Sequence, residues 1–198
     1  MPQFNYLEIH RAIATSAQGE KRIRTVWENR LKESLVQLQD DFESHPVTQE
    51  IDGGPSPANP NISQTLGGEG NLFSFLGFHD SDNPLAPIRE IIANDVKIAV
   101  GVRRNYDRGS VKFRFSLRVP TTSIREASPM TWESGQSWTD AIERGTSGFS
   151  HYLWKKFIVA SRSGYGIQSK YTVRDGEFKP RPYLTEIFNN FVNRMGAR

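Results

Sequence analysis

The sequence predicts an α+β fold, in which a mostly antiparallel β-sheet packs against a long N-terminal helix and a C-terminal helix. Three patterns predict it: a helical apolar stripe over residues 20–42, strict alternation over 96–119, and a second helical stripe over 182–195. With 198 residues the chain is long enough for one domain with a hydrophobic core. We therefore expect a single domain over 1–198, with an extended loop at about 52–70.

The N-terminal helix is predicted by large apolar residues that recur at spacings of four, four, three and four. These residues are Trp27, Leu31, Leu35, Leu38 and Phe42. The helix must end before Pro46, because the residue that precedes a proline is pushed out of the α region.

The C-terminal helix carries a similar stripe: Leu184, Ile187, Phe188, Phe191 and Val192. Pro180 and Pro182 restrict the backbone just ahead of it, and we expect Pro182 to occupy its first helical position. Arg181 is left to reach a carboxylate or a phosphate. The alternative is a solvated loop arginine.

Two alternating stretches predict an antiparallel hairpin, with a turn at 105–109. The expected inward residues are Val96, Ile98, Val100 and Val102 on the first strand, and Val111, Phe113, Phe115, Leu117 and Val119 on the second. Elsewhere we expect a strand at 71–78, extended chain at 151–161, further β-structure after residue 165, and short helices at 83–94 and 137–145. The loop at 52–70 is rich in Gly and Pro and can be ordered by a neighbouring subunit.

The hairpin is unusually basic. It carries Lys97, Arg103, Arg104, Arg108, Lys112, Arg114 and Arg118, opposed only by Asp107. We take Arg103, Arg104, Arg108, Lys112, Arg114 and Arg118 as candidates to face a lumen or a partner; a solvated strand face is the alternative. Alternation places the aromatic residues on the opposite face, so the contact open to nucleic acid is with its phosphate backbone rather than its bases.

No motif for catalysis, a metal or a cofactor is complete in the sequence. Cysteine is absent, the four histidines are widely separated, and no glycine-rich segment forms a dinucleotide or nucleoside-triphosphate loop. We expect no enzyme, no cofactor, no secretory signal peptide and no membrane span. A hydrolase would need a site assembled by the fold, for example around His151.

Three short segments resemble the neck or tail-completion proteins of tailed bacteriophages, which are head-tail connectors. The matching residues are Pro46, Val47 and Thr48; Glu143, Gly145, Thr146 and Ser147; and Arg181, Pro182, Tyr183 and Leu184. The segments occur in the family's order and span most of the chain. Gln49 departs from the family pattern, in which a glycine is expected, and Tyr183 stands in place of a phenylalanine.

The resemblance implies a structural virion protein that forms a ring in the neck, assembled in the host cytoplasm, with DNA passing through its lumen. A hexamer is favoured over a dodecamer, and the implied partners are other neck, head-closure and tail-terminator proteins. Candidate inter-subunit contacts are Glu143, Arg144, Arg181 and Tyr183. A tail terminator and a nucleic-acid-binding module that uses the basic hairpin remain as alternatives.

Overall fold

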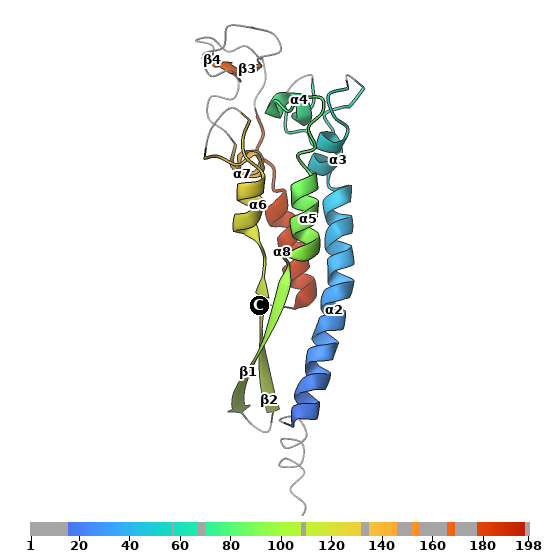
Figure 1. Ribbon diagram of the computed structural model, residues 1–198, viewed down its shortest axis with the longest axis vertical. Helices are drawn as coiled ribbons and strands as arrows, with labels where there is room; N and C mark the ends of the chain where they lie inside the picture. The colour runs from blue at the N-terminus through green and yellow to red at the C-terminus, as the bar shows by residue number, and fades with distance from the viewer. Residues whose placement is uncertain are drawn as a thin grey trace, which may run out of the picture.

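The computed structural model describes residues 16–56, 58–66, 70–107, 110–131, 135–145, 152–154, 166–168 and 178–196. Within these ranges it contains seven helices and two small antiparallel sheets of two strands each. The predicted mixture of helix and strand is confirmed, but the prediction of a mostly β-sheet structure is wrong, because helices form most of the described fold. The protein is elongated, and its longest helix runs along much of its length (Figure 1).

Helix α2 (Ala17–Ser44) confirms the predicted N-terminal helix. Ser16 caps it, accepting a hydrogen bond from the backbone of Gly19. The predicted stripe faces the rest of the protein, but its burial is graded: Leu38 and Phe42 are fully buried, whereas Trp27, Leu31 and Leu35 are only partly covered.

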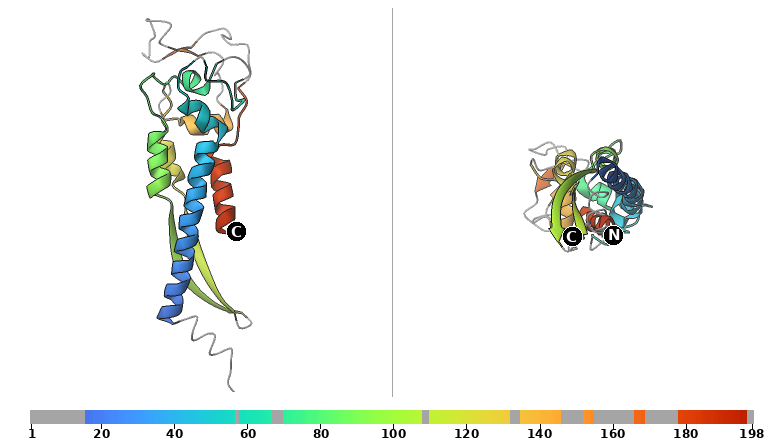
Figure 2. Two further views of the ribbon diagram at one scale, coloured as in Figure 1. Left: turned by 90° about the vertical axis from the view of Figure 1, so that its right-hand side faces the viewer. Right: turned by 90° about the horizontal axis from the view of Figure 1, so that it is seen from below.

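The predicted hairpin is confirmed as β1 (Lys97–Asp107) and β2 (Ser110–Arg118), which pair antiparallel with a register shift between Gly101 and Asn105. It extends beside the first half of α2, away from the helical end of the protein (Figures 1 and 2). The ring of Phe115 lies 3.9 Å from that of Trp27, centroid to centroid. The second sheet is short: β3 (Tyr152–Trp154) pairs with β4 (Gly166–Gln168).

The C-terminal helix α8 (Leu184–Met195) packs along the second half of α2 (Figure 2), and its predicted apolar residues are buried except for Val192, which is partly buried. It begins two residues later than predicted, with Tyr183 at the N-cap. Its last turn is tied to α2 by polar contacts. The guanidinium of Arg30 donates to the carbonyl of Arg194 at 2.7 Å, and Arg194 forms an ion pair with Asp41.

The strand predicted at 71–78 is wrong, because these residues form helix α4 (Leu72–Leu76). Asn71 caps the helix through its side chain, and Gly77 ends it in the left-handed region at φ +74°. Helices α5 (Ala86–Asn94) and α7 (Trp138–Arg144) confirm the two predicted short helices. Helices α3 (Pro46–Asp52) and α6 (Thr121–Ala127) were not predicted.

The described part of the 52–70 loop is held by its own chain rather than left for a neighbour to order. The Glu50 carboxylate is fully buried and accepts hydrogen bonds from the backbone amides of Ser63 and Leu72, at 2.9 and 2.7 Å. Leu66 also forms a β-bridge with Phe178, just ahead of the C-terminal helix. The loop is therefore closed over the helical end by intramolecular contacts.

Candidate functional site

The three short segments named above, around Thr48, Glu143 and Arg181, converge on one junction at the start of α8. Thr48 lies on α3, Glu143 lies at the end of α7, and the 180–184 segment runs between them. Thr146 and Ser147 lie outside the described residues. We call this convergence the α8 junction and define it by Thr48, Glu143, Gly145, Arg181 and Tyr183.

Glu143 caps α8 from another helix. Its Oε1 accepts hydrogen bonds from the backbone amides of Thr185, at 2.6 Å, and Tyr183, at 3.3 Å, while its Oε2 accepts from the Thr185 hydroxyl at 2.7 Å. Tyr183, the N-cap residue, offers no side-chain cap of its own. A carboxylate at a helix N-terminus satisfies free N–H groups and complements the positive end of the helix dipole.

Arg181 joins the same junction to the closed loop. Its backbone amide donates to the carbonyl of Ile142 at 3.0 Å, and its guanidinium donates to the carbonyl of Ser63 at 2.6 Å. Gly145 ends α7 as its C-cap residue, with φ +75°, and a Cβ there would lie 3.0 Å from Cγ of Pro180. The 180–183 segment is therefore fixed along its length by the chain on both sides.

Tyr183 is fully buried, and its hydroxyl forms a hydrogen bond of 2.8 Å with that of Thr48. Burial is the main reason that the pKa of Tyr183 is raised well above its usual value. This side chain cannot contact a second subunit in this conformation, so its prediction as an inter-subunit contact is corrected. Its ring instead packs beside those of His45, Phe42 and Trp138.

His45 links α2 to the junction in its neutral form. Its Nδ1 accepts a hydrogen bond from the Val47 amide at 3.2 Å, which caps α3 and requires that nitrogen to be unprotonated. Burial lowers the pKa of His45, and the nearby charge of Arg181 adds to this, against the opposing influence of Glu186 and of the Pro182 carbonyl. The junction therefore depends on an uncharged imidazole.

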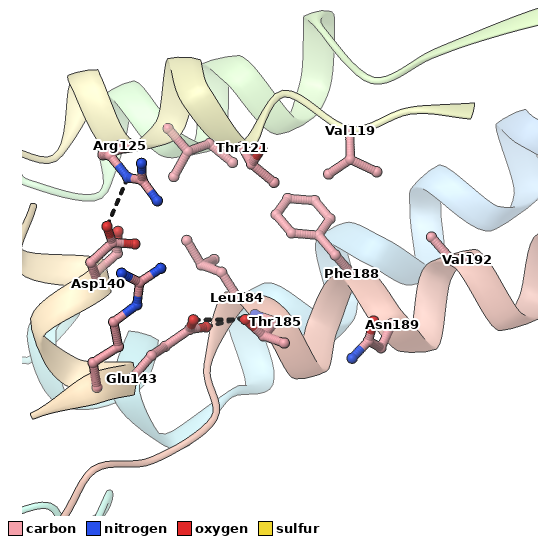
Figure 3. Close-up of a pocket in the computed structure, with 13 residues that line it drawn as sticks. Val119, Thr121, Arg125, Asp140, Glu143, Leu184, Thr185, Phe188, Asn189 and Val192 are labelled. Atoms are coloured by element: carbon pink, nitrogen blue, oxygen red, sulfur yellow. Dashed lines mark hydrogen bonds and ion pairs between the residues drawn. The ribbon is translucent and has the colours of Figure 1, made fainter. Parts of the chain in front are cut away.

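A groove of about 380 Å³ opens beside the junction, between α6, α7 and α8 (Figure 3). Its lining combines apolar and polar side chains: Val119, Thr121, Ile124, Arg125, Thr139, Asp140, Glu143, Arg144, Leu184, Thr185, Phe188, Asn189 and Val192. Arg125 and Asp140 form an ion pair of 2.7 Å at one end. Arg144, a candidate inter-subunit contact, is exposed there, and no pattern in the sequence indicated the groove itself.

Four of the basic candidates, Arg103, Arg104, Lys112 and Arg114, belong to the hairpin, which extends away from the junction (Figure 1), whereas Arg118 directly precedes the groove residue Val119. Arg103 and Arg104 are on β1, where the register shifts, and Lys112 and Arg114 are on β2, paired with Asn105 and Gly101. Arg118 is exposed at the end of β2, and Arg108 lies outside the described residues. The hairpin and the junction are thus separate surfaces.

Comparison of the chain with protein-family models, with curated protein sequences and with solved structures found no match. Over the described residues, no three or more His, Asp or Glu side chains are grouped so as to hold a metal ion. No helix within the described ranges has the length and apolar character needed to span a bilayer. His151, the histidine considered for a hydrolytic site, lies outside those ranges.

Proposed function

We propose that this chain is a structural protein of a tailed-phage virion and assembles into a closed ring of identical subunits in the neck between head and tail. The ring is a hexamer in preference to a dodecamer. The protein acts by holding its neighbours in place, without covalent chemistry, and DNA passes through the lumen. Its partners are the adjoining head-closure and tail-terminator proteins.

One observation carries the proposal: the three segments that resemble this family meet in a single junction. The side chain of Glu143 caps the start of α8, and that of Arg181 ties the segment just ahead of it to the carbonyl of Ser63. In a ring, each subunit presents one surface to the next and a different surface to the previous one, so small angular errors accumulate around the circle. A junction that fixes the direction of a helix suits that requirement.

The groove beside the junction is the surface we assign to the neighbouring subunit. Its lining combines the buried apolar side chains of Leu184 and Phe188 (Figure 3) with the exposed cation Arg144. This combination is typical of the core and rim of a protein interface. The side chains of Glu143 and Arg181 are bonded within the chain, so in this proposal they fix the position of the groove and do not contact the neighbouring subunit.

The ring is tested with two neighbouring residues of α8. Asn189 and Asn190 are both exposed, but only Asn189 lines the groove. We expect native mass spectrometry of Asn189→Arg at high protein concentration to show monomers, because a long cation fills the groove. Asn190→Arg should form rings like the original chain. A strictly monomeric parent protein, or equal assembly of both variants, would contradict this assignment.

The place in the virion needs a separate test. In infected cells that produce the Asn189→Arg chain, we expect heads and tails to accumulate unjoined, whereas Asn190→Arg should yield complete particles in electron micrographs. Normal particles from both variants would count against a role in joining head to tail.

A further inference from the structure

Helix α2 divides into two halves of opposite charge. Its first sixteen residues, 17–32, carry Lys21, Arg22, Arg24, Arg30 and Lys32 against Glu20 and Glu28. Its last twelve, 33–44, carry Glu33, Asp40, Asp41 and Glu43 and no base. This order opposes the helix dipole, which favours acidic residues near the N-terminus by about 0.3–1 kcal/mol each. Helix stability therefore does not explain the pattern.

The two halves also differ in how their charges are compensated. In the acidic half, Glu43 pairs with Arg89 at 2.7 Å and Asp41 pairs with Arg194. In the basic half, the exposed cations Lys21, Arg22, Arg24 and Lys32 form no ion pair with any residue in the described ranges. These four cations are thus not neutralised by an ion pair within the described part of the chain.

The hairpin adds to this charge, because β1 lies against the first half of α2 (Figures 1 and 2). We define the basic end as residues 17–32 together with β1 and β2. It contains eleven Lys and Arg against three Asp and Glu, which makes +8, whereas the whole chain has a net charge of +3. Arg118 is exposed at the end of β2, next to the groove residue Val119.

We propose that the basic end binds the phosphate backbone of double-stranded nucleic acid, without reading its sequence. The sixteen helical residues extend for about 24 Å at ~1.5 Å per residue. A duplex presents roughly one charge per 1.7 Å of its axis, so cations spread over this length can contact several phosphates at once. Arginine is the majority cation here, and its guanidinium fits a phosphate group with two hydrogen bonds.

Surface composition favours nucleic acid over an acidic protein. A protein interface usually has a buried apolar centre. Along residues 17–32, Val26 is the one large apolar side chain that is mostly exposed, at 64%. Along residues 17–32 the cations are therefore accompanied by little exposed apolar area, which suits a polyanion that remains hydrated.

Binding of the duplex by the basic end does not require the ring, so it is measured at equilibrium with the full-length protein. The probe is a fluorescent 24-base-pair duplex of arbitrary sequence, followed by anisotropy over a series of salt concentrations. We expect dissociation constants in the micromolar range at about 50 mM salt and a steep linear fall of log K with log salt. A second duplex of unrelated sequence should bind equally.

A pair of double variants locates the surface. Lys21→Gln/Lys32→Gln removes two exposed cations three turns apart on one side of α2. Gln39→Glu/Lys179→Gln changes the net charge by the same two units elsewhere on the surface. We expect the first to weaken binding by at least about tenfold at 50 mM salt and to reduce the salt slope by about 1.8, since each phosphate contact contributes about 0.9. The second should leave the slope unchanged.

Equal effects of the two variants would overturn the assignment to the basic end. Displacement of the duplex by poly-glutamate at matched charge concentration would overturn the assignment to nucleic acid, in favour of an acidic protein. Ring assembly is tested separately, by Asn189→Arg on another surface. A protein that binds the duplex but forms no ring contradicts the proposed ring, and a protein that forms a ring but does not bind the duplex contradicts the proposal for the basic end.

Discussion

The contact between Glu143 and α8 should contribute a measurable part of the free energy of unfolding. Glu143→Ala removes the acceptor of the Thr185 amide and hydroxyl, at 2.6 and 2.7 Å. Loss of an N-cap destabilises a protein by about 0.5–2 kcal/mol, and loss of a favourable charge at a helix N-terminus by about 0.3–1 kcal/mol. Because water can reach the exposed Thr185 amide in the variant, we expect a decrease of about 2 kcal/mol in the free energy of unfolding.

Glu143→Gln should be milder, since the amide keeps an acceptor oxygen but loses the charge; we expect a decrease of about 0.5–1 kcal/mol. Thermal unfolding followed by circular dichroism measures both. For a chain of this size, 1 kcal/mol corresponds to about 2–4 °C, so Glu143→Ala should lower Tm by about 4–8 °C. The matched control is Glu186→Gln, which removes an exposed carboxylate from the first turn of the same helix.

A double-mutant cycle separates this contact from general destabilisation. Thr185→Val removes the hydroxyl that bonds to Glu143. We expect a coupling energy above about 0.5 kcal/mol between the two positions, the range found for residues in contact. Additive effects, or a Glu143→Ala variant as stable as Glu186→Gln, would refute the inference that Glu143 fixes the start of α8.

Three further predictions concern the same end of the protein. Because burial lowers the pKa of His45, the unfolded chain takes up a proton at higher pH than the folded chain does. The free energy of unfolding should therefore be greatest above about pH 6.5 and fall as the pH drops below it. Urea unfolding of His45→Asn should show a weaker decline with falling pH. Gly145→Ala places a side chain in a glycine-only backbone region and against Pro180, so denaturant titration should show a loss of about 1–3 kcal/mol, with no loss contradicting the geometry. Glu50→Ala leaves two buried amides without an acceptor, at about 1–3 kcal/mol each, and limited proteolysis should then cleave at 53–66 faster than in the parent chain.

The elements predicted correctly from the sequence are those whose apolar periodicity fits only one type of secondary structure. Alternation over 96–119 specifies a strand pair, and the stripe from Trp27 to Phe42 specifies a helix. The segment 72–76 is apolar except for Ser74, and its four apolar residues are all buried; such a short run fits a buried strand equally well. The caps at Asn71 and Gly77 were the available signal for a helix.

The α8 junction could be predicted only as a set of separate segments. Glu143 and Thr185 are 42 residues apart, and Thr48 and Tyr183 are 135 apart. No local periodicity relates such positions, since the fold alone decides which distant groups meet. The same reason explains why Arg181, expected to reach a carboxylate or a phosphate, instead donates to the carbonyl of Ser63.

The two proposed surfaces occupy different parts of an elongated molecule, and this arrangement has a consequence for affinity. The groove lies among α6, α7 and α8, whereas the basic end lies along the hairpin and the first half of α2 (Figure 1). Assembly through the groove would bring several basic ends to one duplex, so each further contact would be intramolecular and the overall affinity would rise without any new type of contact. Asn189→Arg should therefore keep the salt slope expected for a single subunit while losing the tighter binding of the ring. A monomeric variant that binds DNA as tightly as the assembled protein would show that the two surfaces do not act together.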